Sequence, residues 1–165
     1  MTGLIASPVP PPSPPGALIE ADGWFPAINL SQMRAALRLG DGAVTDARLT
    51  QAVEGGIIAA LRDLADWRLT FAGQGLADLA AVAPLARVNG RSMAVILWER
   101  AVQFLAAAEL ADLHRDLSAT NDGRDRAEQQ DLLADDYRRL AMNALADLKS
   151  IGAVLPFARN QVALV

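Results

Sequence analysis

Hydrophobic positions recur at helical spacing through most of the chain. They predict four helical segments, at residues 32–39, 46–69, 92–117 and 124–151. The second stripe consists of Leu49, Val53, Ile57, Ala60, Leu64 and Trp67, and the fourth of Leu133, Tyr137, Leu140, Ala144, Leu148 and Ile151. Because only a short loop separates the last two segments, we expect them to form a long antiparallel helical hairpin. The pattern therefore predicts an all-α, four-helix fold.

Residues that favour helix ends border these segments. Ser31 is the expected N-cap of the first segment, and Gly40 follows its end. Thr45 or Asp46 is expected to cap the second segment, and Gly152 to end the fourth. These signals support the bounds that the hydrophobic pattern indicates.

Glycines also fall inside and between the segments. Gly55-Gly56 interrupts the second one, and each glycine costs a helix about 1 kcal/mol relative to alanine. The pair is therefore expected to permit either a close helix crossing or a kink. Residues 70–91 are expected to be a connector that contains a turn at Asn89-Gly90.

The sequence predicts three parts: an arm at residues 1–23, a helical domain at 24–152 and an extended tail at 153–165. Six prolines lie between residues 8 and 15, which predicts an extended, non-helical arm. The arm is interpreted either as a flexible leader or as a segment that lies over a neighbouring molecule. Trp24 and Phe25 are expected to anchor the arm or to contact that neighbour.

The third helical segment carries charge in an apolar setting. Between residues 93 and 111 the only charged side chains are Glu99, Arg100 and Glu109. Arg100 falls on the same helical face as apolar residues, and a guanidinium that is dry there needs a partner. We therefore expect Glu99 and Arg100 to take part in a buried or interfacial ion pair, with Glu54 and Asp136 as candidate partners of Arg100.

The tail changes character after Pro156, which ends the last helix. Apolar and polar residues alternate loosely there, as in a strand that has nothing in its own chain to pair with. Such a segment is either disordered or added to a partner's sheet, and we favour the second. The residues that would bind the partner are Leu155, Phe157, Arg159, Val162 and Leu164.

Composition narrows the possible functions. The chain is 52% hydrophobic but only 5% aromatic, so its core is expected to be built mainly from Ala, Leu and Val. The net charge of −4 argues against broad nucleic-acid binding. The sequence has no cysteine and a single histidine, His114, and it lacks the motifs of hydrolases, phosphate-binding loops and zinc helices. We therefore predict no enzyme activity, no cofactor and no metal site.

Acidic residues gather near the tip of the predicted hairpin. They are Glu109, Asp112, Asp116, Asp122, Asp125, Glu128, Asp131, Asp135 and Asp136. The cluster is interpreted as a solvated face, as an acidic rim that a basic neighbour recognises, or as a surface that discourages close contact with DNA. The charges at Glu99 and Arg100 argue against a membrane-spanning helix.

Several short motifs, taken in their order along the chain, resemble one known family. They are Trp24-Phe25-Pro26, Ala47-Arg48-Leu49 with Ala52-Val53, Trp98-Glu99-Arg100-Ala101-Val102, and Tyr137-Arg138-Arg139. Together with the arm and the tail, this order resembles the head completion/stabilisation proteins of contractile-tailed phages, also called head-to-tail adaptors or connectors. The resemblance covers residues 24–152.

The resemblance implies a four-helix protomer in a ring of twelve copies that docks below the portal protein. Such a ring would complete the DNA-filled head and carry the next neck protein or tail terminator. Packaged DNA would pass through its channel without sequence-specific binding, and the tail would reach the portal. The implied location is the neck of the virion, after assembly in the host cytoplasm. The alternative is a free helical-bundle binding or regulatory protein that forms no ring.

Overall fold

The computed structural model describes residues 17–39, 44–116 and 124–152, without the side chains of 114–116 and 124–131. This part of the chain is mostly helical, as the sequence predicted. Its α-helices are α1 (Leu30–Ala36), α2 (Asp46–Asp63), α3 (Ala65–Gly73), α4 (Met93–Asp116) and α5 (Arg124–Ser150). A short 3-10 helix, η1 (Leu79–Ala81), follows α3. Two small antiparallel strand pairs complete the fold: β1 (Leu18–Ile19) with β2 (Ile28–Asn29), and β3 (Arg87–Val88) with β4 (Arg91–Ser92).

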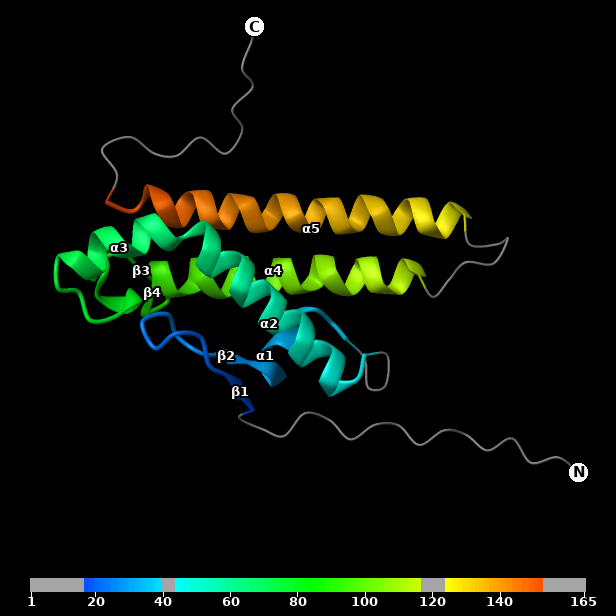
Figure 1. Cartoon of the computed structure of the whole chain (residues 1–165), viewed down its shortest axis with the longest axis horizontal. Helices are drawn as coiled ribbons and strands as arrows, with labels where there is room; N and C mark the ends of the chain where they lie inside the picture. The colour runs from blue at the N-terminus through cyan, green and yellow to red at the C-terminus, as the bar shows by residue number, and fades with distance from the viewer. Residues whose placement is uncertain (1–16, 40–43, 117–123, 153–165) are drawn as a thin grey trace, which may run out of the picture.

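The two longest helices set the shape of the molecule. Helices α4 and α5 lie side by side and run in opposite directions, and α2 crosses α4 obliquely (Figure 1). Many of the buried residues of these two helices are alanines, and small side chains let helix axes approach closely. They are Ala94, Ala101, Ala106, Ala107 and Ala108 on α4, and Ala134, Ala141 and Ala144 on α5. The alanine-rich composition is thus concentrated where the helices meet.

Helix α2 begins where the sequence predicted and ends earlier. The Thr45 side chain accepts a hydrogen bond from the Arg48 backbone N–H at 3.3 Å, which caps the helix. The chain leaves helical geometry at Leu64, which is fully buried, and α3 then continues in a new direction. The predicted segment 46–69 is therefore two helices, and the described part of the chain has five α-helices where four were expected. Trp67 and Phe71 of α3 are half-buried against the core, although the hydrophobic stripe continues across the break.

The glycine pair marks a helix crossing, with no break in α2. A Cβ added to Gly56 would lie 3.0 Å from the Val102 carbonyl oxygen and 3.3 Å from the Ala106 nitrogen of α4. Helix α2 continues without interruption through both glycines. Of the two alternatives, the close crossing is correct, because only a residue without a side chain allows the backbones this approach.

The first helix starts one residue before the expected cap. Asn29 is the N-cap, and its side chain accepts a hydrogen bond from the Gln32 backbone N–H at 2.9 Å. The expectation that Ser31 fills this position is wrong, because Ser31 lies inside α1 (Leu30–Ala36). Gly40 lies outside the described residues.

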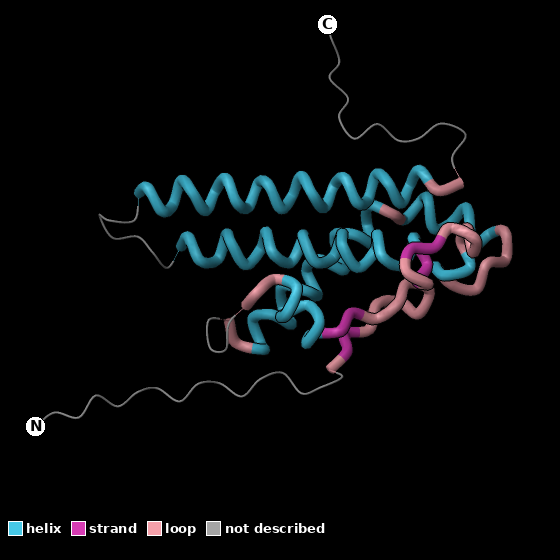
Figure 2. The backbone as a smooth tube through the Cα atoms, turned by 180° about the vertical axis from the view of Figure 1, so that it is seen from behind, coloured by secondary structure: helices cyan, strands magenta, loops and turns pink. Residues whose placement is uncertain are grey.

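The described end of the predicted arm belongs to the folded protomer. Strand β1 pairs with β2, with Leu18 opposite Asn29 and Ile19 opposite Ile28 (Figure 2). Ile19 packs against the core, whereas Leu18 is 53% exposed. Residues 17–23 are thus held on their own chain, and the proline-rich residues before them lie outside the described part.

The connector contains a small hairpin that the sequence analysis did not identify. Asn89 and Gly90 both have positive φ angles, 49° and 73°, and form the two-residue turn between β3 and β4. This geometry is typical of an Asn-Gly hairpin turn. The turn was predicted, but its flanking strands are only two residues long and carry no hydrophobic alternation.

Candidate assembly surfaces

The aromatic entry of the domain is buried in its own core. Phe25 stacks on Trp98 with ring centroids 4.3 Å apart, and the Trp98 indole N–H donates to the Pro26 carbonyl at 3.0 Å. The Trp24 indole N–H donates to the Leu76 carbonyl at 3.0 Å. Trp24 and Phe25 are 6% and 2% exposed. They anchor the N-terminal segment to α4, and they are not accessible to a neighbouring molecule, which corrects that part of the expectation.

The charged centre of α4 is arranged differently from the predicted ion pair. Glu99 pairs with Arg91 at 2.6 Å, next to the β3–β4 hairpin. Arg100 is exposed, and its guanidinium lies 5.2 Å from the ring centroid of Phe104, one helical turn later. The prediction that Arg100 is buried is therefore wrong for the protomer.

Neither candidate partner pairs with Arg100 within the described residues. Asp136 pairs with Arg139 at 2.9 Å, and Glu54 is exposed on the surface of α2. The guanidinium remains in solvent over an aromatic ring that is half-buried. Of the two predicted arrangements, a buried and an interfacial ion pair, only the interfacial pair of Arg100 with a neighbouring molecule stays a hypothesis.

Part of the predicted acidic cluster is neutralised by one arginine. Arg138 of α5 bridges Asp112 of α4 and Asp135 of its own helix, the latter at 2.7 Å. Hydrogen bonds to these two carboxylates raise the pKa of Arg138 further above its ordinary value. Several acidic residues of the cluster lie outside the described side chains. Among the described side chains of the cluster, Asp112 and Asp135 form an ion-pair network with Arg138 that links α4 to α5.

Glu109 occupies a different environment on the same helix. Its carboxylate faces Gly55 across the α2–α4 crossing. Burial raises the pKa of Glu109, and the nearby negative charge of Asp112 raises it further. The side chain is thus a carboxyl group that the fold makes easier to protonate.

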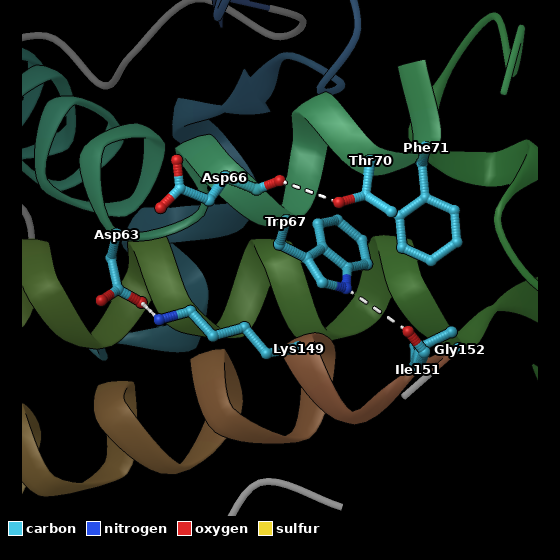
Figure 3. A pocket seen from close by; sticks show the side chains of 8 residues that line it. All are labelled: Asp63, Asp66, Trp67, Thr70, Phe71, Lys149, Ile151 and Gly152. Atoms are coloured by element: carbon cyan, nitrogen blue, oxygen red, sulfur yellow. Dashed lines mark hydrogen bonds and ion pairs between the residues drawn. The ribbon is translucent and has the colours of Figure 1, made fainter. Parts of the chain in front are cut away.

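A pocket opens between α3 and the end of α5 (Figure 3). It has a volume of about 410 Å³ and is lined by Asp63, Asp66, Trp67, Thr70, Phe71, Lys149, Ile151 and Gly152. Lys149 pairs with Asp63 at 2.7 Å, and the Trp67 indole N–H donates to the Ile151 carbonyl at 3.3 Å. These two contacts hold α2 and α3 against the last turn of α5.

Sequence reasoning missed this pocket. It exists because α3 changes direction after Leu64, and that break leaves no signal in the hydrophobic stripe. The predicted tail begins directly at the pocket, since Gly152 forms part of its wall. The predicted partner-binding residues Leu155, Phe157, Arg159, Val162 and Leu164 lie outside the described residues.

The described part of the chain has neither a metal-binding cluster nor a membrane-spanning helix. No group of three or more histidine or acidic side chains there is placed to hold a metal ion. No helix there combines the length and apolar character that crossing a membrane requires.

Comparison with known proteins identifies the family. Residues 19–155 match the phage head completion protein (GPL) family. The chain belongs to this family. The match includes the aromatic entry, all the described helices and the first residues of the predicted tail. The family resemblance inferred from the order of motifs is thus confirmed.

A curated relative carries the same description. The chain is 30% identical over 131 residues to the head completion/stabilization protein of Escherichia phage P2, covering 79% of this chain and 76% of the relative. No solved structure matches the chain significantly. The head completion family consists of structural phage proteins and is not an enzyme family.

Proposed function

We propose that the protein is the adaptor ring of a phage neck. Its family membership supports a structural role in completing a phage head as a component of the virion. In the proposed arrangement twelve copies form a ring that docks below the portal protein of a DNA-filled head. The ring then carries the next neck protein or tail terminator. The observation that carries the proposal is the match to head completion proteins over residues 19–155.

The exposed guanidinium of Arg100 supports contact between copies. It lies over Phe104, and Phe104 in turn stacks near Tyr137 of α5 at 6.2 Å. Both rings are half-buried, so the three side chains form a cationic patch with an aromatic base. In the proposed ring a carboxylate of the neighbouring copy pairs with Arg100. A neighbour that covers this patch would strengthen the pair by excluding water.

The tail is proposed to bind the portal. Leu155, Phe157, Arg159, Val162 and Leu164 supply apolar side chains and one positive charge. Each tail binds weakly by itself, but a ring presents many tails at once, and linked contacts raise avidity by about 10²–10⁴-fold. The strength of the attachment would therefore depend on ring assembly.

In the proposed ring, packaged DNA passes through the channel without sequence-specific binding. The net charge of −4 disfavours tight binding to phosphates. The arginines of the β3–β4 hairpin are engaged within the protomer: Arg87 donates to the Gly90 carbonyl at 2.8 Å, and Arg91 pairs with Glu99. We expect these arginines to lie away from the channel.

Deleting residues 155–165 tests the attachment. DNA-filled heads that carry the portal are mixed with the full-length or truncated protein, and bound protein is measured after sedimentation. We expect the truncated protein to keep its helical circular dichroism and to lose binding. A control of unchanged length replaces these residues with glycine and serine, and should also fail to bind. Normal binding by either variant would contradict the proposal. If the full-length protein bound the heads as single copies without a ring, the result would favour the free helical-bundle alternative.

A further inference from the structure

The pocket between α3 and the end of α5 combines aromatic walls with an excess negative charge. Trp67 and Phe71 lie 4.8 Å apart between ring centroids and line one side. Asp63 is neutralised by Lys149, whereas the Asp66 carboxylate forms no ion pair with the described residues. Asp66 is exposed at the pocket. The pocket therefore favours a ligand that carries an apolar ring and a positive charge.

The segment that follows the pocket wall has this chemistry. Residues 155–159 read Leu-Pro-Phe-Ala-Arg, which places an aromatic ring two positions before a guanidinium. Gly152 has a positive φ of 78° at the end of α5 and lies directly against Phe71. The chain therefore leaves the described part of the protein at the pocket, three residues before Leu155.

The distances allow the segment to return to its own pocket. Phe157 is five residues beyond Gly152, so the chain between them spans at most about 18 Å when fully extended. A tether this short gives an effective concentration in the millimolar range. A chain's own tail would therefore compete for the pocket better than the tail of another molecule.

We propose that the pocket lined by Trp67, Phe71 and Asp66 is the docking site of the chain's own residues 155–159. Phe157 packs against Trp67 and Phe71, and Arg159 pairs with Asp66. The contact holds the tail on the free protomer. A partner that binds the tail has to displace it from the pocket. The inference concerns the isolated protein and does not depend on the proposed ring or its portal.

Proteolysis of the full-length free protein tests the charge pair. Chymotrypsin cleaves after Phe157, and intact mass measures the loss of residues 158–165. A docked tail is cut only when it opens. One aromatic contact and one exposed ion pair together predict cleavage about fivefold to thirtyfold slower than in a free peptide of residues 153–165.

The charge variants give the decisive comparison. Asp66→Arg and Arg159→Glu should each speed cleavage, and the double variant should restore protection, with each rate divided by that of the matching peptide. Glu54→Arg, an exposed charge reversal on α2, is the control and should leave the rate unchanged. Equal rates in all variants and in the free peptide would overturn the proposal. Protection that increases with protein concentration would also overturn it, because it would assign the pocket to a second copy's tail.

An independent measurement uses the tryptophan indole signals in an NMR spectrum of the full chain. Phe157→Ala should shift the indole N–H signal of Trp67, because a stacked ring is removed from the pocket. The signal of Trp98, which is buried against Phe25, is the internal control and should stay in place. An unchanged Trp67 signal would contradict docking of Phe157.

Discussion

Single atoms decide how closely α2 and α4 can approach. Gly56 has backbone atoms of α4 directly over it, whereas its neighbour Gly55 faces the end of the Glu109 side chain. A flexible side chain can move away from an added methyl group, but a helix backbone cannot. The two adjacent glycines therefore have different roles, although the sequence presents them as an equivalent pair.

Matched alanine substitutions at the two glycines should have different effects on stability. Gly56→Ala should lower the free energy of unfolding by about 1–3 kcal/mol, because overpacking forces the helices apart. Gly55→Ala should be neutral or raise it by up to about 1 kcal/mol, because alanine favours the helix. Urea denaturation of both variants measures the difference. Equal effects at the two positions would show that backbone contact does not control the crossing.

The protonation of Glu109 should make stability depend on pH. Burial raises the pKa of its carboxyl group in the folded protein above the ordinary value of 4.5, with a further contribution from Asp112. The folded state therefore holds the proton more tightly than the unfolded state, and this contribution to stability is lost as pH rises from about 4.5 through the raised pKa. Glu109→Gln should be more stable than the native protein at neutral pH.

The Glu109→Gln comparison is made by thermal unfolding at a series of pH values. The difference from the native protein should shrink toward zero as pH falls below 4.5, where the native carboxyl group is also neutral. Glu54→Gln removes an exposed carboxylate and is the control for the change in net charge. A constant difference at all pH values would rule out the titration of Glu109 as its cause.

At the scale of elements, helices were predictable where one local signal decided them. Thr45 caps α2 because its side chain accepts a hydrogen bond from a free backbone N–H at the start of the helix. Gly152 follows α5 because glycine readily adopts the positive φ that ends the helix. The break at Leu64 was not predictable, since the hydrophobic stripe continues to Trp67, and Trp67 contacts Trp24 and Ile151, which are far away in the sequence. Contacts over long separations leave no trace in a local pattern.

The buried face of α5 was predicted correctly at Ala144 and Leu148, but its first half was predicted one residue out of place. The expected stripe began at Leu133, which is 44% exposed, whereas Ala134 is fully buried. The preference for large apolar residues misled the assignment, because this interface is built from alanines. Helix α4 showed no single stripe for a related reason: α2 covers one of its faces and α5 another.

The candidate site was predictable only in part. The sequence indicated that Arg100 needs a partner, and it identified the aromatic entry as an anchor. It could not show that Trp24 and Phe25 are covered by their own chain, because burial depends on how Trp98 and Leu76 are positioned in the fold. The pocket beside α3 was missed for the same reason.

The junction of α5 with α3 should be sensitive to a side chain at Gly152. A Cβ there would lie 2.7 Å from Phe71 Cζ, and the positive φ of 78° is strained for any other residue. Gly152→Ala should lower the free energy of unfolding by about 1–2 kcal/mol. Gly73→Ala, which has open space around it, is the control and should have a smaller effect. Thermal unfolding of both variants measures this, and equal effects would contradict the proposed tight junction.

At the scale of the whole molecule, the Arg100 patch is a surface feature that contacts within the described protomer do not explain. An exposed charge contributes little to the stability of a single chain. Arg100→Ala should therefore change the free energy of unfolding of the protomer by no more than about 0.5 kcal/mol. The same variant should weaken assembly, because its guanidinium is proposed to pair with a neighbouring copy.

The effect of Arg100→Ala on assembly is measured by light scattering of mixtures with portal protein. Arg139→Ala, which removes another exposed arginine of the helical surface, is the matched control and should assemble normally. Loss of protomer stability without any loss of assembly would show that Arg100 acts within the chain.

In the proposed assembly, this member of the head completion family forms a ring on the portal. The most direct test is the mass of the complex that the purified full-length protein forms with purified portal, measured by native mass spectrometry. We expect a complex that contains twelve copies of the protein per portal ring. Complexes that contain only one or a few copies at saturating concentration, or no complex at all, would contradict the account.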